Sequence, residues 1–174
     1  GCGGDEPVYV GFGSMETLGD VMTTAIITNL TRAIVGVACE TAPSTSASDD
    51  RAPRHRLLVH VHKGSRFDVA LRASLAGQNC SNVFILDYPV RHYPIFRRCK
   101  AIVHHGGAGT IGSALLAEKT QIVVPFMFDQ HEWGERLKHK GLCVAVLDPK
   151  ELSKTDFSRA MRAISSLSSS SSSS

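Results

Sequence analysis

Short apolar runs, many of them β-branched or aromatic, recur along the chain and end at glycine, proline or polar residues. Runs of this kind between turn-forming residues are typical of buried strands. The first of them stops at the glycine-rich turn Gly11–Met15. Strands are therefore predicted at Pro7–Val10, Arg56–Val61, Val83–Tyr88, Ala101–His104, Gln121–Pro125 and Cys143–Leu147.

Between these runs, apolar residues recur at three- and four-residue spacing, which is the pattern of helices with one buried face. Ser153, with Asp156 three residues later, is a capping sequence for the last helix, and Gly141 is placed to end the one before it. Helices are predicted at Glu16–Cys39, Asp68–Leu75, Pro94–Arg98, Thr110–Glu118, His131–His139 and Ser153–Ile164.

This alternation of strands and helices predicts an α/β fold, a Rossmann-like parallel sheet with helices on both faces. In such sheets ligands collect at the carboxyl ends of the strands. We therefore expect the segments that follow the strands to converge on one cleft. These segments are Gly11–Met15, Tyr88–His92, His104–Thr110 and Phe126–Gln130.

Three stretches lack this pattern and set the expected domain limits. Residues 1–6 are glycine-rich and polar and are interpreted as a linker. Residues 40–55, rich in Thr, Ser, Ala, Asp and Pro, are predicted to be a flexible insertion. Residues 165–174 are almost pure serine and are predicted to be a disordered tail. Residues 7–164 then form one domain.

Composition supports a single globular domain, because 43% of the 174 residues are hydrophobic and 20% are charged. A formal net charge of +3 is too small to indicate nucleic acid as a partner. No apolar run is long enough to be a transmembrane segment. The five cysteines are widely spaced and form no Cys-x-x-Cys pair, which favours a reduced, cytoplasmic chain.

Residues 101–110, AIVHHGGAGT, join an apolar strand to a helix through three glycines. A helix N-terminus offers free N–H groups and partial positive charge, and glycines let an anion approach the backbone closely. The segment therefore predicts a phosphate site, although the glycines could also serve the turn alone. His104 and His105 point to opposite sides of a strand, so one can face the cleft while the other packs inside.

The earlier turn, Gly11–Met15, contains part of a dinucleotide-binding fingerprint. Position 16 is Glu rather than Gly, and no acidic residue ends the next strand, so a nicotinamide cofactor is disfavoured. Ser14 could hydrogen-bond a ligand or simply be solvated. Asp129 and Gln130 offer the acceptors and donors that sugar hydroxyls need, and Asp129 could equally cap the helix that follows.

A metal site is not expected from this sequence. His60 and His62 lie on one face of a predicted strand, but no carboxylate or thiol stands near them at ligand spacing. The only adjacent aspartates, Asp49 and Asp50, fall in the predicted insertion, which leaves no pair to clamp a metal–diphosphate complex. A nucleophile elbow of the Gly-x-Ser-x-Gly type is also lacking.

Three segments in this order resemble one known family: residues 7–15, PVYVGFGSM; residues 98–110, RCKAIVHHGGAGT; and residues 124–136, VPFMFDQHEWGER. The chain is similar to the C-terminal, donor-binding half of UDP-glycosyltransferases of the two-domain GT-B architecture, most of all the sterol 3-β-glucosyltransferases. The resemblance implies transfer of a hexose, glucose from UDP-glucose, to a sterol or other lipid or small-molecule hydroxyl.

The resemblance also implies roles for individual residues. His105 and the backbone of residues 107–110 would hold the diphosphate, and Ser14, with Gly13, would lie against it from the other side. Tyr88 and Val90 would lie by the nucleobase, and Asp129 and Gln130 would hydrogen-bond the transferred sugar. The UDP-sugar is then a co-substrate, with no metal and no other cofactor. The implied donor-binding residues are Gly13, Ser14, Tyr88, Val90, His105, Gly107, Ala108, Gly109, Thr110, Asp129 and Gln130.

Several features depart from the family. Its acceptor-binding N-terminal domain, which carries the general base, is absent, so we expect the chain alone to be inactive and the acceptor to bind through a missing domain or a partner chain. Ser113 stands where plant relatives have a glutamate on the ribose. The alternative is a non-catalytic, nucleotide-sugar-binding or partner-dependent subunit. The expected location is cytoplasmic or peripheral at membranes.

Overall fold

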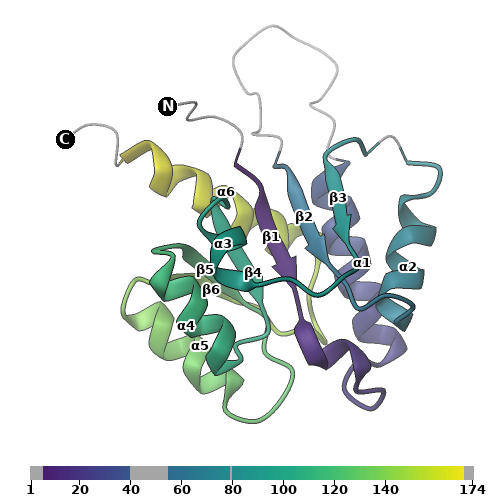
Figure 1. Ribbon diagram of the computed structural model, residues 1–174, viewed down its shortest axis with the longest axis horizontal. Coiled ribbons are helices and arrows are strands. Elements are labelled where there is room, and N and C mark those ends of the chain that lie inside the picture. Colours follow the sequence, from purple (N-terminus) through teal and green to yellow (C-terminus); the bar gives the residue numbers. More distant parts are fainter. Residues whose placement is uncertain (1–5, 40–54, 79, 171–174) are drawn as a thin grey trace, which may run out of the picture.

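The computed structural model describes residues 6–39, 55–78 and 80–170, with side chains to residue 166. Its centre is a six-stranded sheet of order β3-β2-β1-β4-β5-β6 in which every neighbouring pair is parallel (Figure 1). The predicted parallel α/β sheet is thus confirmed. The strands are β1 (Val8–Gly11), β2 (Leu57–His60), β3 (Val83–Leu86), β4 (Ala101–His104), β5 (Thr120–Val123) and β6 (Cys143–Val146).

Helices cover both faces of the sheet (Figure 1). On one face α1 packs against α2 and α6, and on the other α3 packs against α4, with α5 next to β6. Within the described ranges, no helix combines the length and the apolar composition needed to cross a bilayer. The helices are α1 (Thr24–Ala38), α2 (Arg66–Leu75), α3 (His92–Phe96), α4 (Ala108–Leu116), α5 (Gln130–His139) and α6 (Lys154–Ser170), with the 3-10 helix η1 (Gly13–Thr17) after β1.

The alternation of side chains along β1 explains why both faces need cover. Val8 and Val10 are fully buried in the larger core, beneath α1 and α6. Tyr9 points to the other face and packs in a second core with Phe96 and Ile102. Strands that are buried on both faces have continuous apolar sequences, as these strands do.

Strand register brings the loops of the site together. Gly11, the last residue of β1, is level with His60 of β2 and His104 of β4. His60 is in turn level with Leu86, the last residue of β3. The turns that follow these strands therefore leave the sheet side by side at its carboxyl edge.

Two predicted helix limits are wrong by more than two residues, while the other helix limits differ from the predictions by at most two. The helix expected from Glu16 begins only at Thr24, because the Thr23 side chain caps it by accepting a hydrogen bond from Ile26 N at 3.4 Å. The last helix continues to Ser170, past the predicted end at Ile164. Its predicted cap is confirmed, since Ser153 Oγ accepts from Asp156 N at 3.1 Å. Residues 1–5, 40–54 and 171–174 lie outside the described residues.

The expectation of a fully reduced chain is also wrong. Cys39 at the end of α1 and Cys80 after α2 form a disulfide, with Cα atoms 5.3 Å apart. Because α1 and α2 pack together, their carboxyl ends bring the two cysteines within bonding range. Cys99 and Cys143 are free and buried. The cysteine pattern therefore gives no support to the expected cytoplasmic location.

Candidate functional site

The turn after β1 connects the other parts of the predicted site. At Gly13, a Cβ atom would stand 3.4 Å from Cε1 of His105, so this glycine lies directly against the histidine ring. Two residues later, the Met15 sulfur accepts a hydrogen bond from Gln130 Nε2 at 3.6 Å. The structure thus brings together residues that the sequence places in three separate segments.

The His105 imidazole is held by packing. It is 9% exposed and lies between Gly13 and Gly107, where an added Cβ would overlap the ring. Burial lowers its pKa, with a further lowering from nearby His92, so the ring is neutral at pH 7. Its Nδ1 atom has no hydrogen-bond partner among the described residues. The ring therefore retains unsatisfied hydrogen-bonding capacity.

His104 points into the domain instead. It is fully buried, its Nδ1 accepts from Gly106 N at 3.0 Å, and its Nε2 therefore donates to Gln121 Oε1 at 2.9 Å. Burial lowers its pKa to about 4, so the ring stays neutral. His104 thus shapes the turn from inside, as expected for one of two adjacent strand histidines.

Helix α4 begins at this turn with its first amides directed to the site. Gly107 is the N-cap residue and provides no side-chain cap. Thr110 N and Ile111 N donate to Gly107 O, while the N–H groups of Ala108 and Gly109 have no hydrogen-bond partner in the part of the chain that the structure describes. Free amides and the helix dipole make such an N-terminus attractive to an anion.

Gly106 has to be glycine for this turn to form. Its φ of +90° lies in the region that side chains disfavour, and a Cβ there would stand 3.1 Å from the Gln130 carbonyl oxygen. The turn after β4 is therefore packed against the start of α5. This contact places the phosphate-binding candidates beside Asp129 and Gln130.

Gln130 and Asp129 have different surroundings. Gln130 is buried, and its Oε1 accepts from the backbone N–H groups of Phe126 and Met127 at 2.8 and 3.2 Å. Asp129 occupies the N-cap position of α5, but its carboxylate does not cap the helix. Its Oδ2 accepts from Trp133 Nε1 at 2.8 Å instead. The capping interpretation of the Asp129 side chain is therefore wrong.

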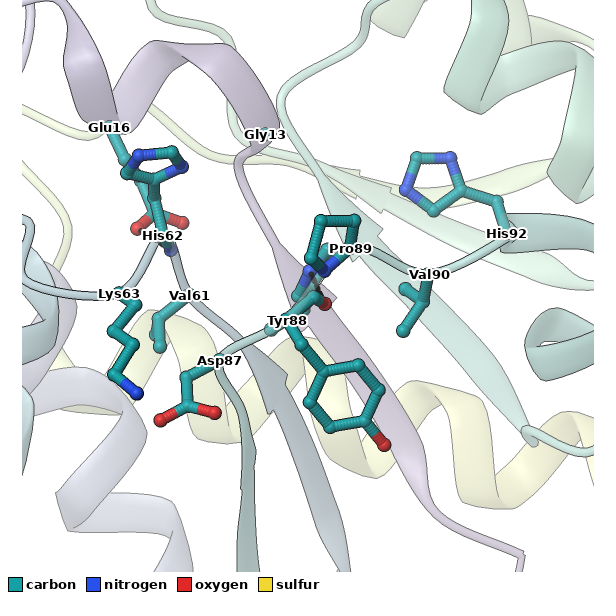
Figure 2. A pocket seen from close by; sticks show the side chains of 11 residues that line it. Gly13, Glu16, Val61, His62, Lys63, Asp87, Tyr88, Pro89, Val90 and His92 are labelled. Carbon is teal, nitrogen blue, oxygen red and sulfur yellow. Dashed lines mark hydrogen bonds between the residues drawn. The ribbon is translucent and has the colours of Figure 1, made fainter.

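A cavity of about 440 Å³ opens beside these residues at the ends of β1, β2 and β3 (Figure 2). Of the predicted donor-binding residues, Gly13, Tyr88 and Val90 line it. The other predicted residues, Ser14, His105, Gly107, Ala108, Gly109, Thr110, Asp129 and Gln130, are not part of its lining. The cavity also has polar lining residues that were not among the predicted donor-binding residues: Glu16, His60, His62, Lys63, Asp87 and His92.

Glu16 is the least expected of these because it is a carboxyl group only 6% exposed. Its Oε2 accepts from His62 N at 2.8 Å and from Ser65 Oγ at 3.1 Å, which ties η1 to the loop after β2. Burial raises its pKa to about 7, and these hydrogen bonds oppose the shift. The one sequence signal for a buried Glu16 was its place in a strand-end turn, directly before a run with apolar positions.

His60 and His62, the two histidines weighed above as a metal pair, both line the cavity. His60 bonds to protein groups through both nitrogens, with the Tyr9 hydroxyl at 2.8 Å and the Tyr88 carbonyl oxygen at 3.1 Å. Among the residues described, no three His, Cys, Asp or Glu side chains are grouped to hold a metal ion. Both histidines form part of the cavity wall.

Residues 67–170 match a family model described as "Erythromycin biosynthesis protein CIII-like, C-terminal domain". Over 160 residues the chain is 34% identical to sterol 3-beta-glucosyltransferase UGT80B1 of Arabidopsis thaliana, covering 91% of this chain and 22% of that protein. Over 66 residues it is 42% identical to UDP-sugar-dependent glycosyltransferase 52 of Dictyostelium discoideum, covering 38% of this chain and 4% of that protein. The chain thus spans less than a quarter of these relatives.

Among solved structures, the fold is similar to CalG4, the calicheamicin glycosyltransferase, with a TM-score of 0.64, 18% identity and coverage of 91% of this chain and 34% of that one. It is also similar to glycosyltransferase VinC in complex with dTDP, with a TM-score of 0.60, 20% identity and coverage of 93% and 34%. In both cases the similarity is to about a third of a larger protein.

Proposed function

Because the chain belongs to the family of erythromycin biosynthesis protein CIII-like C-terminal domains, and has the fold of the C-terminal half of GT-B glycosyltransferases, we propose that it binds a nucleotide-sugar donor. The observation that carries this proposal is the position of His105. Its buried ring, with an unpartnered nitrogen, lies between Gly13 and Gly107 at the N-terminus of α4. An uncapped helix start beside an imidazole suits a diphosphate.

The diphosphate lies between the two glycine turns. The free amides of Ala108 and Gly109 and the Thr110 side chain hold it from the α4 side. Ser14, which is exposed in η1, hydrogen-bonds it from the other side. The arrangement needs no metal, because the helix-end amides provide partial positive charge and the neutral imidazole offers a hydrogen bond.

The sugar and the base lie on opposite sides of the diphosphate. Asp129 accepts hydrogen bonds from the sugar hydroxyls. The backbone engages the Gln130 oxygen and the Met15 sulfur accepts one amide N–H, so Gln130 contributes its second N–H to the sugar. Tyr88, which is 58% exposed at the cavity, and Val90 lie by the nucleobase. A base has an apolar face that stacks on an aromatic ring.

The chemistry of this half-site is stabilisation of the leaving group. When the sugar–oxygen bond breaks, negative charge grows on the UDP diphosphate. Donors already fixed at that position lower the free energy of the transition state more than that of the ground state. His105 and the first amides of α4 are such hydrogen-bond donors, since packing holds them in place before the nucleotide sugar binds.

We assign the substrates from the relatives' names. The donor is UDP-glucose and the acceptor a sterol or another lipid or small-molecule hydroxyl, supported by the sterol 3-beta-glucosyltransferase similarity. The acceptor and the general base are held by residues outside this sequence, on another domain or a partner chain. An acceptor in a lipid phase fits a protein that works at membrane surfaces.

Titration calorimetry with UDP-glucose and with UDP tests donor binding. We expect saturable binding of both, with a dissociation constant below 1 mM, and a loss of about tenfold or more in His105→Ala, the size expected for one strong hydrogen bond. His139→Ala, an exposed histidine at the end of α5, is the control and keeps the wild-type affinity. Absence of binding at millimolar UDP would refute the proposal.

A further inference from the structure

A chain of two hydrogen bonds runs beneath the segment that carries Tyr88. The Tyr9 hydroxyl lies 2.8 Å from His60 Nδ1, and His60 Nε2 lies 3.1 Å from the backbone carbonyl oxygen of Tyr88. These residues come from β1, β2 and the loop after β3, three neighbouring strands of the sheet. The side chain of His60 thus links the centre of the sheet to a loop at the cavity.

The direction of both hydrogen bonds is fixed by chemistry. A carbonyl oxygen can only accept, so Nε2 of His60 carries a proton and donates to Tyr88. Burial lowers the pKa of His60 and raises that of Tyr9, so the ring is neutral and the phenol keeps its proton. In a neutral ring Nδ1 must then accept, and the Tyr9 hydroxyl donates to it.

Tyr9 is a rigid anchor for these two hydrogen bonds. It is 2% exposed, its ring packs edge-on against Phe96 at a centroid distance of 4.9 Å, and Gly11 leaves it space, since a Cβ there would stand 2.6 Å from the hydroxyl. A phenol so enclosed cannot swing to another partner. It therefore fixes the orientation of the His60 ring.

The other end of the loop packs against the same two aromatic residues, Tyr9 and Phe96. His92 begins α3, stacks on Phe96 at 5.1 Å and approaches the Tyr9 ring edge-on at 6.1 Å. The segment Tyr88–His92, which crosses the cavity in Figure 2, is therefore held at one end by His60 and at the other by Phe96. Tyr88 itself is 58% exposed, so its side chain packs little and the hydrogen bond from His60 supports it through the backbone.

We propose that His60 is a positioning residue for donor binding: it holds the Tyr88–His92 segment in the conformation that receives the nucleoside end of the donor. The inference rests on the proposed function. His60 need not touch the donor, because its effect passes through the Tyr88 carbonyl. Removing the ring frees this carbonyl and lets the loop move, so the nucleoside loses a preformed surface, while the diphosphate turn is unaffected.

The test is to measure the affinities of UDP, uridine monophosphate and pyrophosphate by calorimetry for each variant. His60→Ala should weaken UDP and uridine monophosphate by about tenfold, the size of one hydrogen bond to the loop, and leave pyrophosphate unchanged. His60→Gln, whose amide can again donate to the Tyr88 carbonyl, should recover much of the loss. His139→Ala is the control and should match the wild type for all three.

The possible failures can be told apart. Wild-type affinity for uridine monophosphate in His60→Ala would overturn the positioning role alone, as would a loss in His60→Gln as large as in His60→Ala. An equal loss of pyrophosphate binding in His60→Ala would also overturn it, because the damage would then be general. A wild-type chain that binds none of the three would overturn the proposed function, and this inference with it.

Discussion

The side-chain nitrogen of Gln130 donates to the sulfur of Met15 across 3.6 Å, joining residues 115 positions apart in the chain. The oxygen of the same amide accepts from the backbone of Phe126 and Met127. One buried side chain therefore connects the turn after β1 with the loop after β5. The two sides of the proposed diphosphate and sugar site are held together before any ligand binds.

Replacing Gly107 by alanine should weaken UDP binding by about tenfold or more. An added Cβ at this position would overlap the His105 ring, so the imidazole must move from its place between the two turns. The measurement is UDP affinity by calorimetry. Gly112→Ala, in the same helix with open space at its Cβ, is the matched control and should bind UDP normally. Equal affinities in the two variants would contradict the role given to His105.

Replacing Glu16 by glutamine should flatten the dependence of stability on pH. The folded-state pKa of about 7 lies above the ordinary 4.5, so the stability associated with this group is present below pH 4.5 and lost as the pH rises to 7. We expect the variant to gain about 1–3 kcal/mol over the wild type between pH 4.5 and 8.

Urea unfolding at these two pH values measures the Glu16 effect. The free energy of unfolding of the wild type should fall with pH more steeply than that of Glu16→Gln. The glutamine still offers one oxygen to His62 N and Ser65 Oγ, so the change isolates the charge. Parallel pH profiles for the two proteins would show that Glu16 does not titrate in this range.

Replacing Phe128 should reveal backbone strain. Its φ of +54° lies in the left-handed region, which costs a residue with a Cβ about 1 kcal/mol, and its side chain is 84% exposed and adds little packing. Phe128→Gly should therefore be more stable than Phe128→Ala by about 1 kcal/mol in urea unfolding. The alanine variant keeps the strain and serves as the reference. A glycine variant no more stable than it would disprove the strain.

Breaking the Cys39–Cys80 disulfide should lower the free energy of unfolding by about 3–4 kcal/mol, because the bond closes a loop with a sequence separation of 41. Unfolding in urea with and without a reductant measures this. The variant Cys80→Ser should behave like the reduced wild type and no longer respond to the reductant. A wild-type protein whose unfolding is unchanged by reductant would contradict the pairing.

The sequence carried enough information to predict the sheet and the glycine turn that precedes α4. The apolar runs and glycine clusters are local signals, and α4 begins beside Gly107 as the turn chemistry indicates. The start of α1 was misjudged because Met22 is buried at helical spacing although it precedes the helix. Buried residues before the helix and residues inside it share the same apolar spacing there, and only the Thr23 cap marks where the helix begins.

Contacts between distant segments could not be predicted in this way. The link from Tyr9 through His60 to Tyr88 depends on which residues of three strands lie level with one another, and composition does not determine register. The Cys39–Cys80 pair likewise requires knowing that α1 and α2 are neighbours. The sequence therefore indicated the parts of the site but not how they are held.

A crystal structure of the chain with UDP tests the central claim most directly. We predict that the diphosphate lies at the N-terminus of α4, within hydrogen-bond distance of His105 and the amides of Ala108 and Gly109, with the uracil beside Tyr88. UDP bound elsewhere on the domain, or with its diphosphate turned away from His105, would contradict the account.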